Sequence, residues 1–200
     1  MVRIVVMLTL LGSVNLWGQN QESKADFDEV IWFGLDYTQV KFIGVSDQFN
    51  DLDAIQHRYF RAWNDLIEIE SPKYDLKSAF KVSNLIYALD SAIVRSERRD
   101  MKDIVQMSEY ELSENQVAEI VKAYADPAIS KVGAIFVMET LNKTAVKETM
   151  WVTFFHVSTG EVFYTERLIG TPKGMGFRNY WAGGYYRVIT ELINRPYQVK

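Results

Sequence analysis

The 200-residue sequence contains no cysteine and only two histidines. The missing thiols exclude disulfides, cysteine nucleophiles, thiolate metal sites and a lipid-modified N-terminal cysteine. His57 and His156 lie far apart in the sequence, and neither belongs to an H-E-x-x-H motif or to a histidine pair at helical spacing. We therefore expect structural or surface roles for both histidines, and no metal ion or other cofactor.

Motifs of covalent catalysis and nucleotide binding are also scarce. The sequence has no G-x-S-x-G nucleophile elbow. The glycine-rich stretch Gly170–Gly176 lacks both the lysine–serine pair of a P-loop and the G-x-G-x-x-G spacing. Acidic residues are plentiful, but no local pattern selects two of them as the catalytic pair of a glycoside hydrolase. The sequence predicts a protein that is not an enzyme, with a carboxylate-dependent hydrolase as the least favoured alternative.

The sequence has fewer basic than acidic residues and no apolar run long enough to cross a membrane. The formal net charge is −4, which argues against a nucleic-acid surface because phosphate binding needs clustered lysine and arginine. The apolar run Ile4–Leu11 is too short to span a bilayer, which needs about 20 residues. It follows Arg3 and precedes small and polar residues, the plan of a cleavable signal peptide over residues 1–19. We expect no transmembrane segment and a periplasmic or secreted location.

Residues 20–200 have the composition of one globular domain, because 48% of the whole sequence is hydrophobic and 24% is charged. Residues 30–43 are rich in strand-forming side chains, with Gly34 at an expected bulge or bend. An apolar stripe from Leu52 to Leu66 predicts an amphipathic helix that Pro72 stops. Residues 74–101 suggest two shorter helices with a break near residues 82–84.

The C-terminal part of the sequence shows the clearest pattern. Ser113 and Gln116 stand at capping-box spacing before another amphipathic helix. Residues 132–170 then predict a three-stranded meander, and an apolar stripe from Phe177 to Leu192 predicts a final helix. The pair Gly183-Gly184 inside that helix indicates close approach of its backbone to another segment, most simply the sheet.

These elements predict an α+β or α/β fold in two layers. We expect a mixed sheet of about four strands, with the helices packed mainly on one face.

Two groups of residues are candidates for a binding surface. The first surrounds the start of the final helix, where Arg178, Asn179 and Tyr180 point away from the apolar stripe and Lys173 lies in the preceding loop. Arginine and tyrosine are frequent at binding hot spots, and an anion at the helix N-terminus is a second reading. A purely local role, in which Arg178 and Asn179 fix the helix start, is the alternative.

The second candidate group is basic. A helix through residues 95–102 would place four cations on one face, namely Arg95, Arg98, Arg99 and Lys102. This face would suit anionic headgroups or an acidic envelope component, which would make peripheral membrane contact. A solvated face balanced by neighbouring acids is the alternative.

The meander and final helix resemble a family of small α/β modules of the bacterial envelope. Such modules occur in the curli-secretion lipoprotein, in the N-terminal part of TolB and in outer-membrane activators of peptidoglycan synthases. The matching pattern is the buried strand G-A-I-F-V-M-E, the turn H-V-S-T-G-E-V-F and the terminal amphipathic helix. His156 stands where these relatives carry an acid. The sequence style also resembles secreted proteins of Bacteroidetes-type bacteria. The resemblance implies a non-catalytic, periplasm-facing domain.

The sequence therefore predicts a secreted or periplasmic envelope protein that binds another protein or assembles with itself. The alternative is a secreted module that binds a small ligand or glycan through an aromatic and basic surface.

Overall fold

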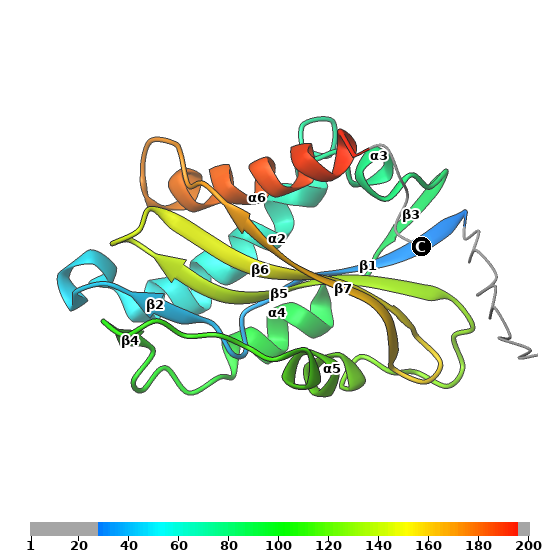
Figure 1. Cartoon of the computed structure of the whole chain (residues 1–200), viewed down its shortest axis with the longest axis horizontal. Helices are drawn as coiled ribbons and strands as arrows, with labels where there is room; N and C mark the ends of the chain where they lie inside the picture. Colours follow the sequence, from blue (N-terminus) through cyan, green and yellow to red (C-terminus); the bar gives the residue numbers. More distant parts are fainter. Residues whose placement is uncertain (1–27, 196–200) are drawn as a thin grey trace, which may run out of the picture.

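The computed structural model describes residues 28–195, so the predicted signal peptide over residues 1–19 lies outside the described part of the chain. A curved sheet crosses the middle of the molecule and helices cover both of its faces (Figure 1). The expected mixed α/β fold is confirmed. Seven strands form the sheet, rather than about four: β1 Glu29–Asp36, β2 Lys41–Ile43, β3 Asn84–Tyr87, β4 Val105–Gln106, β5 Val132–Asn142, β6 Lys147–His156 and β7 Glu161–Gly170.

The sheet is built around β5, which is buried at every position except its first. Along one edge it pairs antiparallel with β6, which in turn pairs antiparallel with β7. Along its other edge it pairs with β1 over residues 132–137 and then with β2 over residues 140–142, both parallel. Short parallel strands complete the sheet, β3 beside β1 and β4 beside β2. The strands expected in the meander are therefore part of a larger, mostly parallel sheet.

The expected strand over residues 30–43 is split in two. Gly34 has a φ of +98°, and the register against β5 shifts between Trp32 and Leu35, so the bulge expected at this glycine is present. The chain then leaves the sheet at residues 37–40 and returns as β2. Both strands pair with the same edge of β5. Both stretches are rich in strand-forming residues, so the composition alone suggested a single strand.

The helical elements are η1 Ser46–Phe49, α1 Leu52–Ala54, the π-helical turn η2 Ile55–Tyr59, α2 Phe60–Ile69, α3 Leu76–Phe80, α4 Asp90–Glu97, α5 Glu114–Lys122 and α6 Phe177–Ile193. The amphipathic helix expected from Leu52 is confirmed by the continuous run α1–η2–α2. The capping box at Ser113 is also confirmed: the Gln116 N–H lies 3.3 Å from Ser113 Oγ, and the Ser113 N–H donates to Gln116 Oε1 at 2.9 Å.

The prediction of two helices over residues 74–101 missed a strand. β3 lies between α3 and α4 and pairs with β1, directly after the break that was expected near residues 82–84. Four residues are too few for a periodic signal, and pairing with β1 supplies the hydrogen bonds that make this segment a strand.

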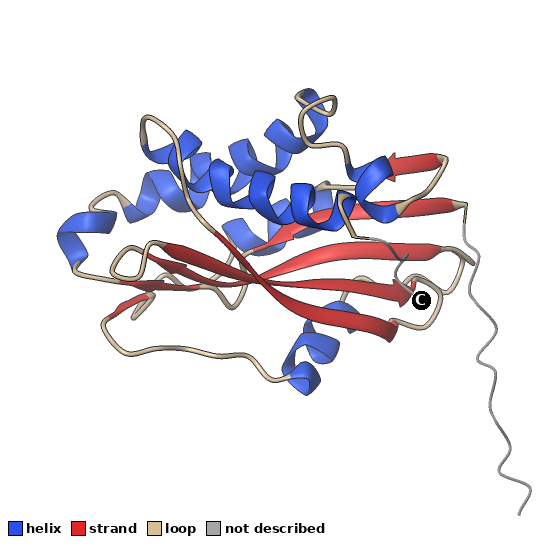
Figure 2. Cartoon of the chain, turned by 45° about the horizontal axis from the view of Figure 1, so that its top comes forward, coloured by secondary structure: helices blue, strands red, loops and turns tan. Residues whose placement is uncertain are grey.

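The expectation that the helices pack mainly on one face was wrong. Figures 1 and 2 show α2, α3 and α6 above the sheet and α5 below it. Alternate residues of each strand supply the two cores, with Trp32, Phe136 and Phe154 facing α2 and α6, and Phe33, Ile135 and Phe155 facing α5. Buried strands of this kind show no alternation of polar and apolar residues, and the sheet therefore needs helices on both faces.

The glycine pair of α6 does allow close packing, as predicted. A Cβ atom at Gly183 would lie 2.1 Å from the backbone oxygen of Lys173, and one at Gly184 would lie 1.3 Å from Glu148 Oε1. The backbone of α6 is thus pressed against the 171–176 loop on one side and β6 on the other. This contact sets the position of the helix start, where the first group of candidate residues lies.

Candidate functional site

A groove lies between the start of α6 and the end of α2. Its volume is about 370 Å³, and it is lined by Leu66, Glu70, Lys73, Tyr74, Lys173, Gly174, Met175, Arg178, Asn179, Ala182, Gly183 and Tyr186. The loop before α6 brings Lys173 and Met175 to one rim, and the first turns of α6 supply Arg178 and Asn179. This α6 groove therefore combines the β7–α6 loop with the α2–α3 connection, two segments about a hundred residues apart in the sequence.

The charge around the α6 groove is mainly positive. Lys73 lies 3.1 Å from Glu70, the only acid among the lining residues. Lys173 and Arg178 are exposed, and within residues 28–195 neither has a carboxylate at ion-pair distance. Two cations therefore remain for a ligand, on a protein whose net charge is −4.

Apolar side chains stand beside these cations. Met175 is 91% exposed and Tyr186 is 38% exposed, both among the large hydrophobic residues that the fold leaves in solvent. Single exposed hydrophobic residues are ordinary, but an unbranched methionine at the rim of a charged groove is a typical adaptable contact.

The structure brings together three of the four candidate residues near α6. Lys173, Arg178 and Asn179 line the α6 groove, whereas Tyr180 points elsewhere. The Tyr180 ring lies 3.6 Å from Lys143 Nζ and packs edge-on against Trp181. The alternative role of Arg178 and Asn179 in the helix start has some support, because Arg178 Nε donates to Asn179 Oδ1 at 3.2 Å.

The second candidate group does not form one helical face. Helix α4 ends at Glu97, so only Arg95 lies within it, and Arg98, Arg99 and Lys102 follow in the turns beyond. The stripe predicted for these residues was therefore wrong in its geometry. Arg98 and Lys102 are exposed, and a contact with anionic headgroups through these two residues stays a prediction.

Arg99 supports the turn between β1 and β2. Its Nη1 donates to the backbone oxygens of Tyr37 and Val40, at 2.8 and 2.7 Å. Burial of the guanidinium lowers the pKa of Arg99 to about 10. Arg99 therefore stabilises the turn and is not available to a partner.

Sequence reasoning missed three carboxyl groups that the fold buries completely, those of Asp36, Glu139 and Glu148. Asp36 and Glu139 each follow a mainly apolar stretch, which was the signal available for finding them, whereas Glu148 lies between Lys147 and Thr149 and gave no such signal. Glu139 accepts three hydrogen bonds from Arg167, one from Trp151 Nε1 at 2.9 Å and one from the Leu112 backbone at 2.9 Å. This Glu139 network attaches the segment before α5 to the sheet.

Glu148 is enclosed between β6 and α6. Neither of its carboxyl oxygens has a hydrogen-bond partner of normal geometry, and the side chain lies against the backbone of Gly184. Burial raises the pKa of Glu148 well above its usual value, an effect that the nearby Tyr185 backbone N–H offsets only in part. A substrate cannot reach a carboxyl group that has no exposed surface. We therefore expect Glu148 to affect the stability of the fold.

Replacing Glu148 by glutamine is expected to stabilise the protein at neutral pH. A raised pKa in the folded state means that the unfolded chain releases the proton first, so stability falls as the pH rises above about 4.5. The loss is up to about 1.4 kcal/mol per pH unit until the folded-state pKa is reached. Thermal unfolding from pH 4 to 8 should show an advantage of Glu148→Gln that grows with pH. The exposed Glu161→Gln serves as control, and a pH-independent difference would contradict the prediction.

Two other findings concern metal ions and membranes. Within residues 28–195, no group of three or more histidine, aspartate or glutamate side chains is arranged to hold a metal ion. In the same part of the chain, no helix combines the length and apolar character that crossing a bilayer requires.

Comparisons with protein-family models, with curated proteins and with solved structures found no match. The resemblance to small envelope modules therefore stays a prediction that rests on the sequence pattern alone.

Proposed function

We propose that this protein is a non-enzymatic binding module, and that its α6 groove receives an acidic segment of a partner protein. The observation that carries this proposal is the meeting of Lys173 and Arg178, neither paired with an acid in the described chain, with the highly exposed Met175. Carboxylates of the partner would pair with the two cations, and an apolar side chain next to them would pack on Met175 and Tyr186.

Physical reasons favour a protein segment over a single small anion at this position. The groove is flanked by exposed apolar surface, which adds to affinity only if the ligand also carries apolar groups. Arginine and lysine at the rim guide an acidic partner during encounter and fix its register. An acidic segment with interspersed apolar residues has both properties.

The proposed location of this interaction is the periplasm or the extracellular space. It is supported by the signal-peptide pattern of residues 1–19. The partner would then be another envelope protein or a second copy of this acidic chain. A carboxylate-dependent hydrolase has less support, because the three carboxyl groups that the fold buries completely have no surface that a substrate could reach.

Site-specific photo-crosslinking in cells tests the proposal. A benzophenone amino acid replaces Met175 in the full chain, and the same replacement of Met107, which is 64% exposed and lies outside the groove, is the matched control. We expect a discrete protein adduct from position 175 and none of that mass from position 107. No adduct at 175, or the same adduct at both positions, would contradict the proposal.

Charge reversal makes the test specific. Lys173→Glu with Arg178→Glu should weaken the adduct at position 175 by about tenfold, as expected for loss of two interface charges. Arg98→Glu with Lys102→Glu applies the same charge change elsewhere and should leave the adduct unchanged. The opposite pattern would transfer the binding surface to the exposed residues that follow α4.

A further inference from the structure

The carboxyl end of β1 is a second candidate for a ligand site, because ligands of α/β proteins commonly bind beyond the carboxyl ends of parallel strands. This strand lies between β3 and β5 and runs parallel to both. The connection from β1 to β3 carries α2 over one face of the sheet, and the connection from β3 to β5 carries α5 over the other face (Figure 1). The connection that leaves β1 and the connection that leaves its neighbour β3 therefore cover opposite faces, and where the connections of adjacent parallel strands diverge in this way a crevice opens beyond their carboxyl ends.

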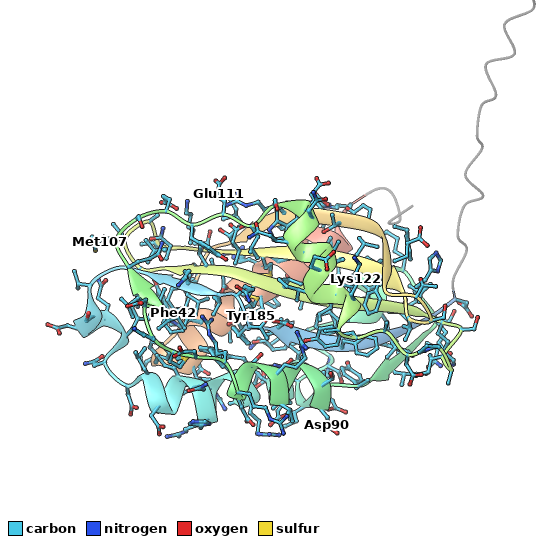
Figure 3. The ribbon with its side chains drawn as sticks, turned by 90° about the horizontal axis from the view of Figure 1, so that it is seen from below. Phe42, Asp90, Met107, Glu111, Lys122 and Tyr185 are labelled. Atoms are coloured by element: carbon cyan, nitrogen blue, oxygen red, sulfur yellow. The ribbon has the colours of Figure 1, made fainter. Side chains whose placement is uncertain are left out.

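A cleft is present at this point. Its volume is about 510 Å³, within the range of small-molecule sites, and it is lined by Thr38, Gln39, Arg95, Leu112, Asn115, Gln116, Glu119 and Ile120. The turn after β1 forms one wall, α4 supplies Arg95, and the start of α5 supplies the amides. Figure 3 shows α4 and α5 as separate helices on this side of the molecule.

Arg95 is positioned at the cleft by two neighbours. Its Nε lies 3.8 Å from the buried carboxylate of Asp36, and its guanidinium carbon lies 5.2 Å from the centre of the Tyr124 ring. Asp36 already accepts hydrogen bonds from the Thr38 backbone, the Thr38 hydroxyl and the Tyr124 hydroxyl. It therefore holds Arg95 through charge, at a distance too long for a hydrogen bond.

Most donors of Arg95 lack acceptors within the described chain. The Nε atom is buried without a hydrogen-bond partner, and the Tyr124 hydroxyl is the one side-chain group among residues 28–195 that interacts with the other donors. A guanidinium has five N–H donors in a planar fork that matches a carboxylate. An arginine fixed by an ion pair and a ring contact, but with most of its donors unused, is suited to a ligand that supplies the acceptors.

The rest of the cleft suits hydroxyl groups and a small apolar surface. The side-chain amides of Gln39 and Asn115 are exposed and make no hydrogen bond within the described chain. An amide offers both a donor and an acceptor, as a hydroxyl group requires. Leu112 and Ile120 are the apolar members of the lining.

We propose that this cleft binds a small hydroxy carboxylic acid, from lactate in size to a sugar acid such as glucuronate. Its carboxylate would pair with Arg95, and its hydroxyl groups would bond to Gln39 and Asn115. This site is distinct from the α6 groove and does not depend on the function proposed for it.

Titration of the isotope-labelled full chain, followed by NMR, tests this proposal. Glucuronate and lactate are the probes, and glucuronate methyl ester is the neutral control. We expect at least one of the acids to shift the side-chain amide signals of Gln39 and Asn115 and the Nε–H signal of Arg95, with a Kd of about 1 mM or tighter. The ester should bind about tenfold more weakly, because it cannot form the charged pair.

Variants separate the proposed contact from general effects. Arg95→Gln should abolish the shifts, whereas Arg98→Gln, a nearby cation outside the cleft lining, should retain them. Asn115→Ala, at an exposed helix position, should weaken binding without a change in the melting temperature, so the test does not depend on Arg95→Gln remaining folded. Equal binding of acid and ester, shifts that survive Arg95→Gln in a folded protein, or no shifts with either acid would each overturn the proposal.

Discussion

Replacement of Arg167 by methionine is expected to lower the free energy of unfolding by about 3 kcal/mol. Arg167 makes the charged contacts of Glu139, with Nη2 donating to Glu139 Oε1 at 2.6 Å and Nε at 3.0 Å. The Glu139 carboxylate has no exposed surface, so removal of the guanidinium leaves a buried charge with only the Trp151 and Leu112 donors. Chemical denaturation with urea measures the loss.

Two companion variants identify the cause. Arg167→Met combined with Glu139→Gln removes both charges but keeps an amide oxygen for the Trp151 and Leu112 N–H donors, so it should recover much of the stability. Glu111→Ala removes an exposed carboxylate 3.7 Å from Arg167 and should change stability by less than about 1 kcal/mol. A double variant no more stable than Arg167→Met would show that the loss comes from packing rather than charge.

Alanine at Gly183 is expected to destabilise the protein by about 2–3 kcal/mol, although alanine is the better helix former by about 1 kcal/mol. The added Cβ would lie 2.1 Å from the backbone oxygen of Lys173 and 2.7 Å from its nitrogen. Backbone atoms cannot rotate away, so α6 or the 171–176 loop must move. Thermal and urea unfolding measure the effect, and Thr190→Ala in the same helix is the control for the propensity change.

Gly184→Ala should lower the stability of the protein by a similar amount, for a different reason. A second substitution distinguishes this cause from the one at Gly183. At Gly184 the obstacle is the Glu148 side chain, 1.3 Å from the added Cβ. Glu148→Ala should therefore rescue Gly184→Ala but not Gly183→Ala. Equal rescue of both glycine variants would contradict the geometry of this contact.

Loss of the Gly183 contact also bears on function. Lys173 belongs to the loop and Arg178 to α6, so the contact between these two segments sets the distance between the two cations. The Trp63 indole N–H also donates to the Arg178 backbone oxygen, at 2.9 Å. Displacement of the helix start would change the spacing of the two cations. Photo-crosslinking of a folded Gly183 variant therefore reports on whether the α6 groove must keep its shape.

The sequence by itself determined the local elements and several of their details. The stripe from Leu52, the capping box at Ser113, the bulge at Gly34 and the close packing at Gly183-Gly184 were all predictable. Each depends on a short-range property, such as helical periodicity, side-chain capping or the absence of a Cβ atom, which neighbouring residues express without help from the rest of the chain. Lys173, Arg178 and Asn179 could also be grouped from the sequence, because they are close together in the chain, and they line one groove.

Tertiary structure alone decided the arrangement of the sheet and which residues line the α6 groove and the cleft beside β1. β3 and β4 exist only because β1 and β2 lie beside them, and α5 covers the second face of the sheet because β5 and β6 are apolar on both sides. Arg95, Asp36 and Tyr124 come from three distant segments, and Lys73 joins Lys173 across a similar separation. Such contacts depend on long-range pairing and burial, which no local spacing encodes.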